Sequence, residues 1–505
     1  MGKLRVRLAA PQRAPRQRWA DWTGRMTRFD PRIGGYSRAE ICFPGYNRMR
    51  PENRSSGLSI RSHCRRNSTG LGNMSALIGG CVVIMLFLLF LQPADMAYAQ
   101  GVAVGPDGEP LKQSFALPYA FYNEKFGAAA GFAYGAAGFP QPQATMLMTG
   151  MGGTEGSGML FFIGHNIRAP HVSRLFVDPI FSVGYFSDNI SYVDGKPKYA
   201  GQRAGSNDSD RQNHIIGDGW DNYGRANFKY LLPIGTGEDT IISRYRFKDG
   251  LLVSGAQGGQ SWNPFESGKT YLELRPFWRS MEVDGKYGNY ESKTNGIDFS
   301  IFWDNRDLPA NATVGEAIRF KVSRDFGLFD STTSWTSLYT ELSKYFSLGS
   351  SERFRQRVLA LDFWTSYSPS WSHEPDGSID HAPPPYTGSS LGGLWRMRAY
   401  PSQRYNDQAA IYYCAELRLI PKWNPFEYWN WLQRQLDVQW IQLVPFAEVG
   451  RVASEYNLER LHSDMKWDAG LGFRFLAKGL VLRIDSAYGD EGLGVQMMIS
   501  QPFQW

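Results

Sequence analysis

The stretch Leu391–Pro421 reads LGGLWRMRAYPSQRYNDQAAIYYCAELRLIP and joins a polar loop to a regularly alternating segment. One side of that segment carries Ile411, Tyr413, Ala415, Leu417 and Leu419, and the other side carries Tyr412, Cys414, Glu416 and Arg418. A period of two with one apolar side predicts a β-strand that separates two different environments. The charges favour a water-filled interior on one side, and the apolar residues favour lipid on the other.

Three C-terminal segments repeat this pattern. Trp467–Phe475 and Leu480–Tyr488 each place apolar residues on one side and charged residues on the other, and Leu493–Trp505 ends on the aromatic residues Phe503 and Trp505. Inward charges would destabilise a soluble, lipocalin-like barrel, because the interior of such a barrel is apolar. We therefore predict an all-β fold, a transmembrane antiparallel β-barrel with a polar interior.

Sixteen segments of this kind follow one another, an even number, as bacterial single-chain barrels require. The predicted strand cores are 125–137, 142–151, 157–167, 174–188, 223–233, 240–253, 269–281, 294–304, 315–325, 333–347, 354–368, 409–420, 438–450, 467–475, 480–488 and 493–503. This order puts the long polar segment 189–222 on the periplasmic side, where turns should be short. A strand is therefore missing or over-predicted between 174 and 290.

The N-terminal residues differ in composition from the rest of the chain. Residues 1–73 carry 16 Lys and Arg against 4 Asp and Glu. This composition indicates a disordered extension, or a segment that is not translated because the true start codon is that of Met74. The alternative is a basic arm that binds anionic partners. Residues 74–99 have a short apolar core and end in Ala97-Tyr98-Ala99, which predicts a signal peptide cleaved after Ala99. We expect 100–124 to be a short periplasmic lead-in and 125–505 to be a barrel in the bacterial outer membrane.

The exported part shows no pattern of an enzyme or of a nucleic-acid-binding protein. Residues 101–505 hold 38 basic and 43 acidic residues, so we expect no nucleic-acid partner. Motifs of hydrolases, nucleotide-binding loops and zinc sites are absent from the sequence, and we expect no enzymatic activity and no cofactor. His373, Glu374, Asp376, Asp380 and His381 could hold a metal, but a solvated loop is the expected state of this group.

Four motifs resemble the barrel of the BamA/TamA-type outer-membrane assembly and bacterial surface-antigen superfamily. They are the turn Asp304-Asn305-Arg306-Asp307 with Pro309 and Gly315, the strand around Trp335–Leu348, the loop Met397-Arg398-Ala399-Tyr400-Pro401 with Arg404, and Phe446-Ala447-Glu448-Val449-Gly450. The resemblance spans about 118–505 and is strongest in the last third. It implies that the long loop between strands 11 and 12 folds back into the lumen.

The resemblance also implies a contact between that loop and the wall. In the family, the loop arginine pairs with the acid of the last motif, which here predicts Arg398 against Glu448. A planar guanidinium matches a carboxylate with two parallel hydrogen bonds. Glu416, Asp468 and Asp485 remain alternative partners, and an unpaired Arg398 in a solvated loop is a further alternative. Two departures from the family pattern are Ala399 in place of a glycine and Glu448 in place of an aspartate.

The function expected from the resemblance is the assembly or translocation of outer-membrane proteins or lipids, with an unfolded protein or a lipid as client. The alternatives are a passive or loop-gated pore and a structural surface antigen. We expect outer-membrane lipid and the machinery that inserts barrels as partners, and no periplasmic POTRA domain. The glycine- and alanine-rich first segment, FGAAAGFAYGAAGF, favours a weak seam for strand addition or, equally, a close fit against the inward loop.

Overall fold

The computed structural model describes residues 101–499 apart from positions 106, 124–125, 194, 200, 374–377, 429–432, 434–437 and 478–479. The predictions for the basic segment 1–73, for the signal peptide 74–99 and for Phe503 and Trp505 lie outside the described residues. Glu374, Asp376 and the side chain of His373 also lie outside them.

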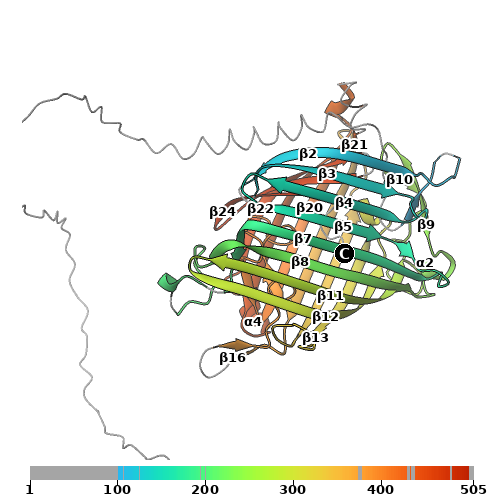
Figure 1. Cartoon of the computed structure of the whole chain (residues 1–505). Coiled ribbons are helices and arrows are strands. Elements are labelled where there is room, and N and C mark those ends of the chain that lie inside the picture. Colours follow the sequence, from blue (N-terminus) through green and yellow to red (C-terminus); the bar gives the residue numbers. More distant parts are fainter. Residues whose placement is uncertain are drawn as a thin grey trace, which may run out of the picture. The chain divides into compact units, whose positions relative to one another are not determined.

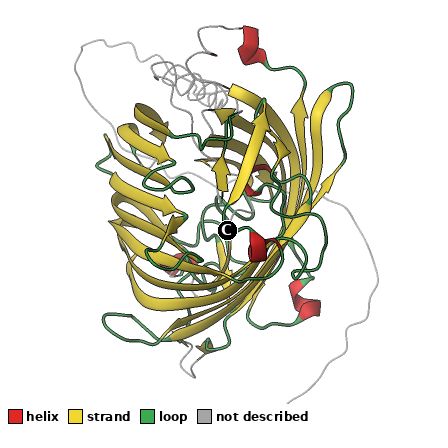
Figure 2. Cartoon of the chain, turned by 90° about the vertical axis from the view of Figure 1, so that its right-hand side faces the viewer, coloured by secondary structure: helices red, strands yellow, loops and turns green. Residues whose placement is uncertain are grey.

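Sixteen long strands form an antiparallel barrel in which each strand pairs with the one that precedes it in the wall (Figures 1 and 2). The strands are β2 (Gln113–Asn123), β3 (Gly127–Ala137), β4 (Thr145–Gly153), β5 (Gly158–His165), β7 (Leu175–Ser191), β8 (Ile215–Leu231), β11 (Lys269–Gly285), β12 (Gly288–Asp304), β13 (Gly315–Asp325), β14 (Trp335–Ser347), β15 (Phe354–Tyr367), β20 (Ala409–Pro421), β21 (Val438–Ala453), β22 (Lys466–Ala477), β23 (Leu480–Gly489) and β24 (Gly492–Ile499). The prediction of a sixteen-stranded antiparallel barrel is confirmed.

One predicted wall strand was wrong and one wall strand was missed, and the two errors cancel in the count. Residues 113–123, predicted as part of the lead-in 100–124, form the barrel strand β2, which pairs along its whole length with β3. Its alternation is interrupted by Pro118, which has no N–H for a ladder and so reads as a break in the strand. Residues 240–253, predicted as a wall strand, form two short strands, 243–248 and 251–254, that are not part of the barrel wall. With β2 counted first, 192–214 falls between the fifth and sixth strands, so the predicted conflict over the long segment disappears.

We call the barrel end where β2 begins the near end and the opposite end the far end. The near-end connections contain β6 (Ile167–Arg168), α2 (Thr236–Asp239), η3 (Pro309–Asn311) and η4 (Pro425–Tyr428). The far-end connections contain η2 (Pro197–Tyr199), β16 (Ser372–His373), β17 (Ile379–Asp380), β18 (Ser389–Leu391), β19 (Tyr405–Asp407) and α4 (Leu458–Leu461). Successive connections alternate between the ends because the strands are antiparallel.

A small internal sheet occupies the near end. β9 (Ser243–Lys248) pairs in parallel with β1 (Gly101–Ala103) and antiparallel with β10 (Leu251–Ser254). Tyr245 of this sheet is fully buried in a cluster with Trp440, Leu476 and other inward residues of β20–β23. Trp440 Nε1 also donates to the carbonyl of Gly250 at 3.0 Å. The segment that follows β8 therefore packs on the inner side of β20–β23, across the barrel from β8. β9 and β10 are labelled at the right-hand end of the barrel in Figure 1. We call this sheet the near-end plug.

The two faces of the wall differ as expected for a transmembrane barrel. Large apolar side chains are exposed on the outside, among them Phe132, Leu160, Phe299, Phe320 and Phe473. Charged side chains are buried on the inside, among them Asp298, Glu341, Glu416, Arg474 and Asp485. In the part of the chain that the structure describes, no helix has the length and apolar character to cross a membrane.

Candidate functional site

The inner side of β21 presents the Phe446–Gly450 motif to the lumen. Phe446, Glu448 and Gly450 are buried, whereas Ala447 and Val449 between them are exposed on the outer side. The alternation of the strand therefore assigns the three motif positions to one face. Glu448 lies opposite Cys414 of β20 and Asp468 of β22, so its carboxylate is surrounded by neighbouring strands.

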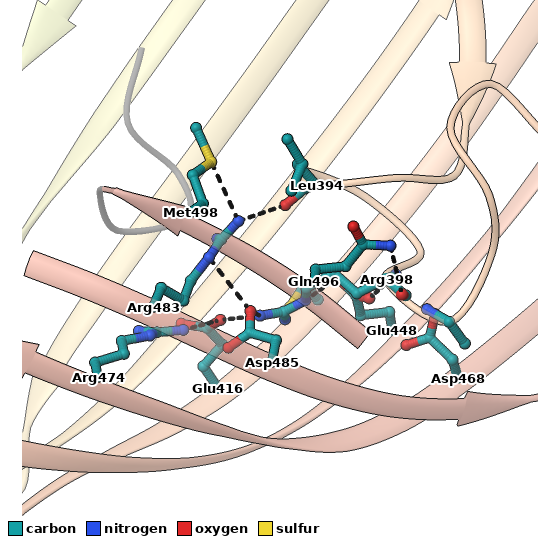
Figure 3. Close-up of polar contacts among 12 residues, drawn as sticks. Leu394, Arg398, Glu416, Glu448, Asp468, Arg474, Arg483, Asp485, Gln496 and Met498 are labelled. Carbon is teal, nitrogen blue, oxygen red and sulfur yellow. Dashed lines mark hydrogen bonds and ion pairs between the residues drawn. The ribbon is translucent and has the colours of Figure 1, made fainter. Parts of the chain in front are cut away.

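The loop between β15 and β20 turns back into the barrel between the paired strands β18 and β19 (Figure 3). Gly392 and Gly393 both have positive φ values, 109° and 104°, where side chains with a Cβ are strained. A Cβ on Gly392 would also lie 2.1 Å from the carbonyl oxygen of Pro401. Both glycines are thus required for the reversal that places residues 394–400 against the inner wall. The inward loop predicted between strands 11 and 12 is present.

Arg398 is fully buried at the centre of the loop contacts (Figure 3). Its Nε donates to Glu448 Oε1 at 3.1 Å, and its Nη1 lies 2.9 Å from Glu416 Oε1 and 2.7 Å from Asp485 Oδ2. Its backbone N–H donates to Glu448 Oε2 at 2.7 Å. The structure thus brings the predicted pair Arg398 and Glu448 together. It also gives Arg398 two of the carboxylates considered as alternatives, so one guanidinium joins β20, β21 and β23.

The surroundings of Arg398 favour its charged state. The guanidinium carbon lies 3.5 Å from the centre of the Phe446 ring, a cation–π contact inside a desolvated site. Burial disfavours the charged form, but Glu448 and Glu416 outweigh that effect and raise the pKa of Arg398 above its usual range. Around this centre, Glu416 also accepts from Arg418 at 2.8 Å and from Arg474 at 2.7 Å. The acids are therefore neutralised as a network of buried ion pairs.

The remaining alternative acid, Asp468, binds the loop backbone. Its Oδ2 accepts from the N–H of Ala399 at 3.0 Å, and Gln496 donates to the carbonyl of Arg398 at 3.3 Å. The positive φ of this turn, 57°, belongs to Met397, so the backbone conformation at position 399 does not require the glycine of the family pattern. Gly494 makes the approach possible, because a Cβ there would lie 2.7 Å from the carbonyl oxygens of Arg398 and Ala399.

Other loop residues extend the contacts toward the far end. The Tyr400 hydroxyl donates to the carbonyl of Trp467 at 2.9 Å, and Pro401 turns the chain toward Arg404. Arg404 is fully buried and pairs with Glu491 at 2.6 Å, and its Nη1 donates to Ser209 Oγ at 2.8 Å. The far-end loop 192–214 and the hairpin between β23 and β24 are thereby tied to the inward loop.

Sequence reasoning missed several residues of this site. Arg203 pairs with Asp407 at 2.8 Å, and Arg396 pairs with Glu341 on β14 at 2.8 Å. Arg203 and Ser209 belong to the long polar segment that was assigned to the wrong barrel end, so their contact with the loop could not be anticipated. Recognising β2 as the first wall strand would have placed this segment at the correct barrel end.

The predicted turn motif lies at the near end and closes the connection from β12 to β13. Arg306 and Asp304 form a buried pair with Nε 2.7 Å from Oδ1. Asp307 Oδ1 accepts from the N–H groups of Leu308 and Thr313 at 2.9 and 2.8 Å. Burial raises the pKa of Asp307, and the hydrogen bonds from Thr313 and Leu308 act in the opposite direction. Gly315 has φ 98° and leaves no room for a Cβ beside the carbonyl of Asn305. Asp304, Arg306, Asp307 and Gly315 therefore build a rigid turn.

The inner wall of β3–β5 differs from the charged wall of β20–β23. The register places Leu147 and Met151 of β4 opposite Ile163 and Met159 of β5, and His165 on the same side pairs with the inward Asp178. Phe161 shares this inner side, and the small residues of β3, from Ala129 to Gly135, continue it. The lumen therefore has one apolar wall, and the side chains of Leu147, Met151, Met159, Phe161 and Ile163 on it are only half-buried.

The structure describes two side chains of the candidate metal-binding group in the loop 373–381. Asp380 and His381 are exposed at the far end. Asp380 Oδ2 lies 3.6 Å from His381 Nε2, and His381 Nδ1 lies 3.1 Å from Ser334 Oγ. Within the described ranges no three His, Cys, Asp or Glu side chains form a cluster that could hold a metal ion.

Comparisons with known proteins give matches only among solved structures. No protein-family model matches the chain, and no curated protein matches it. The chain is similar to BamA from Haemophilus ducreyi lacking POTRA domains 1–3, with 11% identity and a TM-score of 0.41 over 85% of this chain and 77% of that one. It is also similar to CdiB from Escherichia coli, with 10% identity and a TM-score of 0.46 over 82% and 68%, and to CdiB from Acinetobacter baumannii, with 10% and 0.40 over 81% and 65%. At this identity the likeness is one of fold.

Proposed function

We propose that the chain resides in a bacterial outer membrane, with the near end in the periplasm and the far end outside. Support comes from the apolar exterior and polar interior, which single-chain barrels of that membrane share. The longest connection, 368–408, belongs to the far end, and such barrels carry their longer loops on the outside.

We further infer that the protein handles a membrane client, either an unfolded outer-membrane protein or a lipid, and is not a passive pore. The observation that carries this inference is the occupation of the lumen by the chain itself at both ends. The near-end plug packs on Trp440 and Leu476, and the inward loop is held by Arg398 and Arg404. A passive pore needs an unobstructed aqueous path, whereas a client that meets the wall laterally does not.

The apolar inner wall also favours a client with apolar groups. Half-buried Met151, Met159 and Phe161 face a lumen whose other wall is charged. Leaving apolar surface in contact with water costs about 25 cal/mol per Å², so this wall gains most from an acyl chain or from the apolar side chains of a strand. A hydrophilic solute would gain nothing there.

A loop-gated pore is the second candidate, because one lumen cation is exposed. Arg225 lies opposite Phe277 of β11 and on the same side of β8 as Asp221 and Lys229, yet its side chain is exposed. The lumen between the plug and the loop is therefore wide enough for water. Movement of either obstruction would open a charged path.

A deletion strain tests the proposal, with outer-membrane protein and lipid content as the readout. We expect a changed content that the full chain restores. A photoreactive residue at Phe161 should crosslink to lipid or to an unfolded barrel protein, and one at Asn227 on the polar inner wall should not. Unchanged membrane content together with steady conductance in planar bilayers would refute client handling and support the pore.

A further inference from the structure

Two near-end turns share the pentapeptide WNPFE. One copy is Trp262–Glu266, between the near-end plug and β11, and the other is Trp423–Glu427, between β20 and β21. Both connections follow an even-numbered strand of the wall, so both lie at the near end. Six wall strands separate them: β11, β12, β13, β14, β15 and β20.

The first copy is a turn held by its own side chains. Asn263 Oδ1 accepts from the N–H of Phe265 at 3.1 Å, which is an Asx turn. Asn263 Nδ2 donates to Glu266 Oε1 at 2.9 Å, and the N–H of Glu266 donates to the carbonyl of Asn263 at 3.0 Å. Trp262 protrudes from this turn with 82% of its surface exposed.

The second copy has the same turn. Asn424 Oδ1 accepts from the N–H of Phe426 at 3.1 Å, and Asn424 Nδ2 donates to the carbonyl of Val438 at 2.9 Å. Trp423 is 60% exposed. The phenylalanines differ, because Phe265 is exposed and Phe426 is buried. The property that the two copies share is therefore a rigid turn that displays a tryptophan.

Both turns lie on the outer side of the wall, at the edge of the apolar band. Trp303, which shares the outer side of β12 with the exposed Phe299 and Ile301, donates from Nε1 to the carbonyl of Ser267 at 3.0 Å, next to the first turn. Phe426 of the second turn packs edge-on against Phe475, which shares the outer side of β22 with Leu471 and Phe473, at 6.1 Å between ring centres. The exposed tryptophans are thus continuous with the lipid-facing surface.

We propose that Trp262 and Trp423 are paired anchors that insert into the head-group region of the membrane leaflet at the near end. An indole ring has an apolar body and one N–H donor, and this combination favours the boundary between acyl chains and water. The second anchor also lies beside the exposed cation Lys422, which suits lipid phosphates. Because the anchors lie on different sides of the barrel, they hold its near rim at one depth.

The test uses the full chain with bimane attached to W262C, W423C or V253C, with Cys42, Cys64 and Cys81 changed to serine. Val253 is the matched control, because it is 60% exposed at the same end but belongs to the plug strand β10. The proteins are placed in vesicles of phosphatidylethanolamine and phosphatidylglycerol. The vesicles contain a lipid with a nitroxide on the head group or at carbon 12 of the acyl chain, and aqueous iodide is measured separately.

We expect the head-group nitroxide to quench labels at 262 and 423 about two-fold more than the label at 253, and more than the carbon-12 nitroxide does. Equal lipid quenching at all three positions, with strong iodide quenching at 262 and 423, would overturn the proposal and point to a periplasmic protein as the occupant. A second measurement avoids the labels: brominated lipids should quench the native protein more than a W262Y and W423Y double variant. Equal quenching of the two would also overturn it.

Discussion

Replacing Arg398 by glutamine should release the inward loop, and the cost can be worked out from its contacts. Of its three carboxylate partners, Glu416 keeps Arg418 and Arg474, and Asp485 keeps Arg483 at 3.5 Å. Only Glu448 loses its guanidinium partner, although the Tyr412 hydroxyl still donates to it. Breaking one buried pair costs about 3–5 kcal/mol, and the lost contact with Phe446 adds about 1 kcal/mol.

The assay is urea unfolding of the refolded barrel in detergent for R398Q, E448Q and the double variant. If R398Q leaves the Glu448 carboxylate without a guanidinium partner, the loss of unfolding free energy in the double variant should be about 2 kcal/mol smaller than the sum of the losses in the two single variants. The matched control is R418Q, since Arg418 is also fully buried and its partner Glu416 keeps the guanidiniums of Arg398 and Arg474. Additive losses, or a loss in R418Q as large as that in R398Q, would refute the central role of the Arg398–Glu448 pair.

Three further predictions concern the seat of the loop, the plug and the far end. G494V should displace the loop because its Cβ would meet two carbonyl oxygens, and limited proteolysis should then cut within 391–407. G152V, whose Cβ meets nothing within 4 Å, should leave the loop protected. W440A should loosen the near-end plug by about 3–5 kcal/mol, measured as faster hydrogen exchange at Tyr245 and as higher conductance if the plug gates a pore. Burial lowers the pKa of His214, so its contribution to the far-end loop is complete above pH 6.5 and is lost as the pH falls below that value. The protection factors of amides 201–213, corrected for the intrinsic pH dependence of exchange, should be lower at pH 5.5 than at pH 7.5, and H214N should remove this difference.

Much of the fold was predictable because strands between lipid and water repeat a simple pattern. Among the last five wall strands, β20, β21, β22 and β23 each carry inward charges, which exclude a soluble barrel. The early wall was harder to read. Pro118 interrupts the pattern of β2, and β9 alternates as a wall strand does because one of its faces packs inside the lumen. Period two reports two environments on the two sides of a strand and does not report which environments they are.

The candidate site was predictable in part, through a resemblance and through strand parity. The alternation of inward and outward positions along β21 assigned Glu448 to the interior, and the resemblance of the loop motif suggested Arg398 as its partner. The sequence did not indicate that Glu416, Asp468 and Asp485 all take part, or that Arg404 binds Glu491 and Ser209, because these contacts join segments up to 195 residues apart.

The sequence by itself determined most of the wall strands and their two faces, because these depend on neighbours along the chain. Only the tertiary structure decided which carboxylates surround one guanidinium, which segment obstructs each end of the lumen, and that both tryptophan turns lie at the edge of the same apolar band. Those features depend on barrel register and on loops that cross the lumen, and the free energy that selects them comes from desolvated contacts between distant residues.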